Sequence, residues 1–269
     1  MEYPPLFQAR WRFRPLILCN LAALVLLGLW AWPEGHALMN RFDEWLFHLL
    51  NQPLASNDLW LYAWTVASMR PFDVVVGLIL LMLLIKGDWV FRAAQTRAAI
   101  FGFIAILVLL LIIRSLLAKY INTTDLQHDS PSRVLPEAVR LSHIFPQLEK
   151  TWELKDNSGR SFPGDHASVL LIWAMFMSLY ARSFGRQLVI WSLAVLFMLP
   201  RLVAGAHWGQ DDYIGGVAIA LAALAWGIYT PYAAHVTRLG LRLSEPLFAI
   251  ARVIPLVNRM SLVRAGFSR

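Results

Sequence analysis

Charge is scarce in this sequence. Only 15% of the 269 residues are charged, 58% are hydrophobic, and the mean hydropathy is +0.54. A soluble domain usually has about a quarter of its residues charged, so an ordinary soluble globule is excluded. Cysteine is nearly absent, since Cys19 is the single one, which excludes an internal disulfide and a cysteine-based metal cluster. There is also no internal repeat or low-complexity segment. The composition indicates a polytopic membrane protein.

Aromatic residues and positive charge are, by contrast, abundant. The chain has 12 Trp and 15 Phe, and such rings collect at the headgroup level of a bilayer. Lys and Arg outnumber Asp and Glu by 24 to 17, which gives a net charge of +7. In a membrane protein this excess indicates which loops are cytoplasmic and favours contact with anionic lipids. It does not indicate a nucleic-acid partner.

Apolar runs predict an all-α integral membrane protein with six transmembrane helices. A spanning helix needs roughly 20 mostly apolar residues. The first run leaves through Trp30-Ala31-Trp32-Pro33, which is not the small-residue site of a cleaved signal peptide, so it is interpreted as an anchor. The six runs are residues 16–32, 74–85, 98–117, 167–181, 187–199 and 213–234.

The segments between and after these runs predict an interfacial helix, the orientation in the membrane and a separate tail. Residues 42–54 alternate apolar and polar side chains at helical spacing, which predicts an amphipathic interfacial helix. Lys and Arg in the short loops favour both termini on the cytoplasmic side. The polar loop 119–165 then faces outward, over the active site. Residues 1–234 form the six-span domain. The basic tail, residues 235–269, is predicted to be a cytoplasmic interfacial helix divided by Pro246 and Pro255.

Two polar clusters at the ends of spans are candidates for a functional site. Placing ionisable side chains in or next to a membrane costs free energy, so such residues usually have a function. In the second cluster, His207 and Asp211 are four residues apart and can interact directly. Gly205 provides a turn that lets Arg201 and His207 approach one phosphoryl group.

In the first cluster, Ser161-Phe162-Pro163-Gly164-Asp165-His166 leads into an apolar helix. Unpaired N–H groups at a helix start suit a phosphate, and His166 is placed to protonate a leaving oxygen. The two clusters together predict a metal-free phosphoryl-transfer site with His207 as the nucleophile and no cofactor.

These motifs resemble a known family. Arg201-x5-His207-x3-Asp211, preceded by Ser161-Phe-Pro-x-x-His166, is similar to the type 2 phosphatidic acid phosphatase superfamily. More narrowly, the block 161–166 with Pro200-Arg201 and Gly205-Ala-His207-Trp resembles the bacterial lipid A 1-phosphate phosphotransferases. The resemblance covers about residues 41–231.

The resemblance implies an activity, a location and residue roles. Such enzymes move a phosphate from undecaprenyl diphosphate to lipid A at the periplasmic face of the bacterial inner membrane. It implies that His207 forms a phosphohistidine, that Asp211 orients His207, that His166 is the general acid, and that Arg201 binds phosphate. Ser161 and Gly164 are further phosphate-binding candidates.

Two departures from the family pattern matter. Gly164 and Asp165 replace the middle pair of the usual Pro-Ser-Gly-His motif, which removes a hydroxyl donor and adds a negative charge. The family's first motif, Lys-x6-Arg-Pro, is absent. The cations that would replace it are sought among Arg133, Lys119, Arg70 and Arg160.

Other interpretations stay open. The enzyme can be a simple undecaprenyl-diphosphate or phosphatidylglycerophosphate phosphatase, or the chain can be a non-catalytic transporter or lipid-binding protein. Asp165 can be an acid that only suits the helix dipole, and Asp212 is expected to be solvated. Arg114 and Lys119 are expected to snorkel to the interface. The histidines without a partner pattern are treated as interface residues: His36, His48, His128, His143 and His235.

Overall fold

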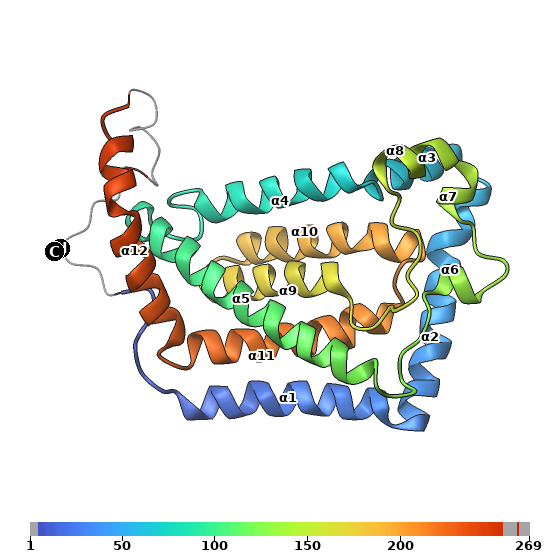
Figure 1. Cartoon of the computed structure of the whole chain (residues 1–269), viewed down its shortest axis with the longest axis horizontal. Helices are drawn as coiled ribbons and strands as arrows, with labels where there is room; N and C mark the ends of the chain where they lie inside the picture. The colour runs from blue at the N-terminus through green and yellow to red at the C-terminus, as the bar shows by residue number, and fades with distance from the viewer. Residues whose placement is uncertain (1–4, 255–262, 264–269) are drawn as a thin grey trace.

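The computed structural model describes residues 5–254 and residue 263, and in this part of the chain the regular structure is helical (Figure 1). The first half contains α1 (Phe13–Ala31), α2 (Pro33–Asn51), η1 (Gln52–Ala55), α3 (Asp58–Ala67), α4 (Arg70–Ile85), η2 (Ala93–Gln95) and α5 (Thr96–Ile121). The second half contains α6 (Pro131–Val134), α7 (Leu141–Ile144), α8 (Pro146–Trp152), α9 (Asp165–Ser178), α10 (Phe184–Val203), η3 (Asp211–Gly216), α11 (Val217–Ile228) and α12 (Tyr232–Ala251).

The all-α prediction is confirmed for the described residues. Each of the six predicted apolar runs contains a helix, but the runs 167–181 and 213–234 also include non-helical residues at 179–181 and 229–231. By length and composition, four helical segments are able to cross a membrane: Phe13–Ala31, Ala93–Ile121, Phe184–Val203 and Asp211–Ile228. The helices at the other two runs are shorter, with 16 residues in α4 and 14 in α9.

The core lies around α9, which packs between α5, α10 and α11 (Figure 1). A helix that is apolar on all sides has to be buried, and Ile172, Trp173 and Phe176 of α9 are almost completely so. The indole nitrogen of Trp173 donates to the carbonyl of Leu80 on α4 at 3.2 Å. These contacts hold α9 in the core, and His166 lies at the start of this helix.

Helix α2 crosses one end of the bundle (Figure 1). Its apolar side chains Phe42, Trp45 and Leu49 are exposed, as expected of an interfacial helix. Its inward face is partly polar. The buried Asn51 donates to the carbonyls of Val139 and Val203, and the second of these lies at the end of α10. Helix α2 therefore ties the polar loop to the end of a long apolar helix.

Helix α12 crosses the opposite end (Figure 1) and corrects one prediction. Pro246 was expected to divide the tail, but it lies inside a continuous helix. Proline in a helix removes one backbone hydrogen bond, and Pro246 is on the exposed side, where the freed carbonyl does not have to be buried. Gly240 of α12 faces the ring of Phe101 on α5. Pro255 lies outside the described residues.

Candidate active site

The predicted histidines and arginine meet at the end of the bundle that α2 crosses. The start of α9 supplies His166, the last turn of α10 supplies Arg201, and the following turn carries His207. That turn depends on Gly205, whose φ of +81° suits glycine and whose missing Cβ leaves room for Phe47 and Ser132. The turn predicted at Gly205 is confirmed.

His207 is buried and contacts two carboxylates. Its Nδ1 lies 3.0 Å from the carbonyl of Ser161 and 3.3 Å from Asp211 Oδ2, and its Nε2 lies 3.3 Å from Asp165 Oδ1. Because all three neighbours accept hydrogen bonds, both ring nitrogens donate. Burial lowers the pKa of His207, but the hydrogen bonds to Asp165 and Asp211 outweigh it and raise the pKa to about 10. The two carboxylates therefore favour the imidazolium form of His207.

Asp211 is completely buried and satisfies several donors at once. Its Oδ2 accepts from the hydroxyl of Ser161 and, at 2.8 Å, from the backbone N–H of Trp208. Its Oδ1 lies 3.2 Å from Nε2 of His128. This carboxylate thus holds the turn that carries His207 in one position.

His128 corrects the expectation that it is an ordinary interface residue, because it contacts Asp211. Burial lowers the pKa of His128, but the hydrogen bond and the charge of Asp211 raise it above its usual value overall. No spacing rule connects a loop histidine at position 128 with an aspartate at position 211, so sequence reasoning had no signal for it.

His166 lies between two other carboxylates. Its Nδ1 is 3.1 Å from Asp165 Oδ1, and its Nε2 is 3.2 Å from Asp73 Oδ2. Asp165 is half exposed and contacts both histidines through the same oxygen. It is therefore more than an acid that suits the helix dipole.

Arg201 is buried and paired with Asp73 of α4, a residue that sequence reasoning did not select. Arg201 Nη2 donates to both oxygens of Asp73 at 2.7 Å, and Nη1 donates to the carbonyl of Ser68 at 3.2 Å. Nη2 also lies 3.2 Å from His166 Nε2. The sequence did contain a signal for Asp73, because an ionisable residue at the start of an apolar run is a candidate for a functional site.

The two other phosphate candidates of the first motif face inward. The Ser161 hydroxyl is bonded to Asp211, and the N–H of Gly164 donates to the carbonyl of Asp211 at 3.0 Å. A Cβ at Gly164 would lie 2.4 Å from Asp212 Oδ1. Both residues hold the start of α9 against η3. Asp212, expected to be solvated, is buried in this contact, because the chain before α9 covers it.

The four cations proposed to replace the missing first motif have no direct contact with the histidines in the described structure. Arg70 pairs with Glu153 at 2.7 Å and Arg133 with Asp129 at 3.1 Å, and all four of these side chains are well exposed. Lys119 and Arg160 are also exposed.

Arg114 is placed differently from these four cations. It lines a pocket of about 310 Å³ together with Asp73, Asp165, His166 and Arg201. It was expected only to snorkel.

The same pocket has a polar end and an apolar wall. The wall comes from α4, α5, α9 and α10 and includes Phe72, Leu80, Leu111, Leu170 and Phe197. The pocket therefore joins Asp165, His166 and Arg201 to the apolar sides of four helices.

Comparison with known proteins identifies the superfamily of the chain. Residues 100–235, half of the chain, match the model of the PAP2 superfamily, and the chain belongs to this superfamily. The resemblance seen in the motifs is confirmed.

The chain is also similar to a particular enzyme, Lipid A 1-diphosphate synthase of Escherichia coli (strain K12). The two are 28% identical over 218 residues, which cover 80% of this chain and 87% of the relative. No solved structure matches.

Proposed function

We propose that this protein is an integral membrane phosphotransferase that moves a phosphoryl group from undecaprenyl diphosphate to the 1-phosphate of lipid A. The observation that carries the proposal is the contact network that joins His207, His166 and Arg201 through Asp165 and Asp73 in a PAP2 protein. The similarity to a lipid A 1-diphosphate synthase supports the choice of acceptor.

The proposed reaction has two steps. His207 Nε2 attacks the terminal phosphorus, an N–P bond forms, and the bond from phosphorus to the bridging oxygen breaks. His166 donates a proton to the departing undecaprenyl phosphate. An oxygen of the lipid A 1-phosphate then attacks the phosphohistidine, the N–P bond breaks, and His207 is regenerated.

Asp165 has a specific task in this scheme. His207 cannot attack while Nε2 carries a proton, and Asp165 Oδ1 lies 3.3 Å from that nitrogen and 3.1 Å from His166 Nδ1. We assign Asp165 to accept this proton from His207 and to release it to solvent, because the Asp165 side chain is half exposed; His166 brings its own proton for the leaving group. Its carboxylate has to leave Nε2 when the phosphoryl group arrives, because both need the same position.

Arg201 and Arg114 are the proposed phosphate cations. Arg201 is held by Asp73 in the substrate-free structure, and the incoming phosphoryl oxygens would compete with this carboxylate for the guanidinium. Arg114 lines the pocket that contains Arg201. Positioning and charge neutralisation would supply most of the catalysis.

The lipid part of the substrate fits the apolar wall of the same pocket. Six membrane spans, α1, α4, α5, α9, α10 and η3 with α11, would put this pocket at the outer surface of the inner membrane, with residues 119–165 on the periplasmic side. The basic residues in the opposite loops favour that orientation. Residues 1–234 would then be the catalytic domain and 235–269 a cytoplasmic interfacial tail.

One experiment separates transfer from hydrolysis. Purified protein is incubated with undecaprenyl diphosphate labelled in its terminal phosphate, with and without lipid A, and in the presence of a chelator. We expect label on lipid A. Label only as free phosphate would replace the proposal with a lipid diphosphate phosphatase. Activity lost in chelator would contradict the metal-free mechanism.

A further inference from the structure

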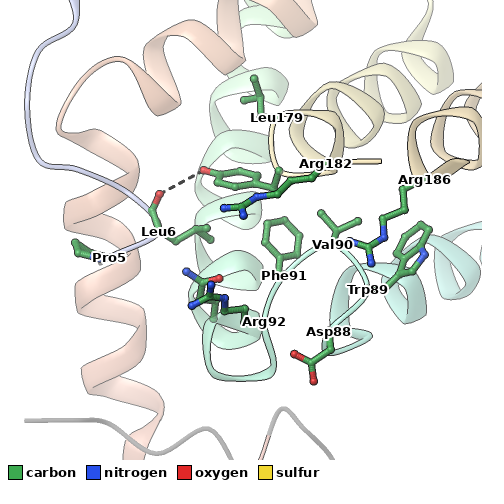
Figure 2. Close-up of a pocket in the computed structure, with 12 residues that line it drawn as sticks. Pro5, Leu6, Asp88, Trp89, Val90, Phe91, Arg92, Leu179, Arg182 and Arg186 are labelled. Carbon is green, nitrogen blue, oxygen red and sulfur yellow. Dashed lines mark hydrogen bonds between the residues drawn. The ribbon is translucent and has the colours of Figure 1, made fainter. Parts of the chain in front are cut away.

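A second set of cavities lies at the end of the bundle opposite the histidines. One, of about 400 Å³, is lined by Arg92, Arg182 and Arg186 (Figure 2). Another, of about 370 Å³, is lined by Arg10 and Arg12. The two cavities share Leu6, Leu179 and Tyr180, so they adjoin each other. We refer to them together as the arginine pocket.

The charge of the arginine pocket is strongly positive. Among the described residues that line it, Asp88 is the single carboxylate against five arginines. Asp88 Oδ1 also accepts from the backbone N–H of Ala93 at 3.1 Å, so it caps the turn before η2. All five cations are arginine, whose planar guanidinium binds phosphate oxygens in pairs. This composition selects an anion, and a phosphate group in particular.

The walls of the pocket are apolar and aromatic. Trp89, Val90 and Phe91 line the larger cavity beside the arginines (Figure 2). The hydroxyl of Tyr180 donates to the carbonyl of Leu6 at 3.4 Å, which fastens the N-terminal segment across the pocket. Arg12 lies 5.3 Å from the ring centre of Tyr229 in the smaller cavity. A ligand that matches these walls has an apolar part next to its phosphate.

The pocket lies where apolar helices end. Helix α4 ends at Ile85, α10 begins at Phe184, and α1 begins at Phe13. Phe184 is 82% exposed and Leu179 is 48% exposed. Large exposed apolar side chains beside a cluster of arginines are typical of the boundary between lipid tails and headgroups.

We infer that the arginine pocket binds the phosphate of an amphiphilic anion, and we identify that ligand by its chemistry as a phosphate ester with an attached apolar group. Its source is either an anionic phospholipid of the adjacent leaflet or a soluble organic phosphate. This site is separate from the histidine cluster and does not rest on the proposed function.

The test compares two triple variants of the full chain in detergent. The pocket variant carries Arg92→Gln, Arg182→Gln and Arg186→Gln. The control variant carries Arg14→Gln, Arg238→Gln and Arg242→Gln, which removes the same charge from exposed arginines that line neither cavity. Thermal unfolding checks that both variants are folded. A pocket variant that unfolds is replaced by the single changes, which must then lower binding one by one.

Binding is measured by native mass spectrometry with phosphatidylglycerol and phosphatidylcholine of the same chains, and by calorimetry with ATP and inorganic phosphate. We expect phosphatidylglycerol to bind the pocket variant at least about tenfold more weakly than the wild type, with the control variant within about twofold. A loss seen only with ATP or phosphate keeps the site and makes its ligand soluble. Equal losses in both variants, or no loss in either, would overturn the inference.

Discussion

The two ends of the helix bundle differ in how many carboxylates accompany their cationic side chains. At the end crossed by α2, each cationic group of the histidine cluster contacts a carboxylate: His207 and His166 share Asp165, and Arg201 is held by Asp73. At the other end, five arginines and one carboxylate are among the described residues that line the two cavities. Buried charges need partners, whereas charges at a surface are solvated. In the proposed reaction, phosphate replaces a carboxylate as the partner of Arg201 at the first end, and the inferred site at the second end binds an anion.

The largest effect is expected from the nucleophile. His207→Ala should lower turnover by more than about a thousandfold, because it removes the nitrogen that is proposed to form the N–P bond. The measurement is transfer of labelled phosphate, with trapping of the phosphoenzyme on the wild type. His143→Ala, which changes an exposed histidine of the polar loop, is the control. Turnover near the wild-type value in the His207 variant would refute the assignment.

Replacing Asp73, the carboxylate that contacts Arg201 and His166, tests whether these contacts contribute to turnover. Asp73→Asn should lower kcat by about a hundredfold, because Arg201 and His166 lose the group that positions both. Asp73→Glu keeps the charge and should recover part of the loss, which separates positioning from misfolding. Asp58→Asn on α3 is the exposed control. An unchanged kcat would mean that Asp73 only neutralises Arg201.

The missing phosphate cation can be located by comparing two arginines. Arg114→Gln should raise KM about tenfold, the effect of one lost hydrogen bond to a charged group. Arg133→Gln should have a smaller effect, because Arg133 is bound to Asp129 and does not line the pocket. A larger rise in KM for Arg133→Gln than for Arg114→Gln would instead assign the phosphate-binding role to the polar loop 119–165.

The pH dependence tests the contact between Asp165 and His207. If His207 must be neutral to attack, kcat/KM rises with pH toward the pKa of about 10 in the free enzyme. Asp165→Asn removes a carboxylate that raises this pKa, so the rising limb should move to lower pH by about one pH unit or more. A pH profile identical to that of the wild type would show that Asp165 does not control the nucleophile.

The smallest effect on turnover is expected at the opposite end. The variant with Gln at positions 92, 182 and 186 should keep its turnover in detergent within about twofold of the wild type, because those arginines do not line the histidine pocket. Transfer assayed at saturating substrate checks this. A large loss would mean that the two ends are coupled and that the arginine pocket regulates the enzyme.

Much of the site could be read from spacing. His207 and Asp211 are four residues apart, and Gly205 is the residue type that a reversal with positive φ favours, so local rules were enough. Asp73 and His128 were missed because their partners are more than 80 residues away in the sequence. The place of Arg114 in the pocket was not predicted, because a snorkelling arginine and a pocket arginine have the same pattern along one helix.

The sequence by itself determined the all-helical architecture and the family, because apolar runs and two short motifs depend only on neighbouring residues. The tertiary structure decided which charges meet. The packing of α4 against α9 and α10 brings Asp73 to Arg201 and His166, and the fold of the N-terminal segment against α9 and α11 gathers arginines from several loops. Charges interact through space, and only the folded chain sets those distances.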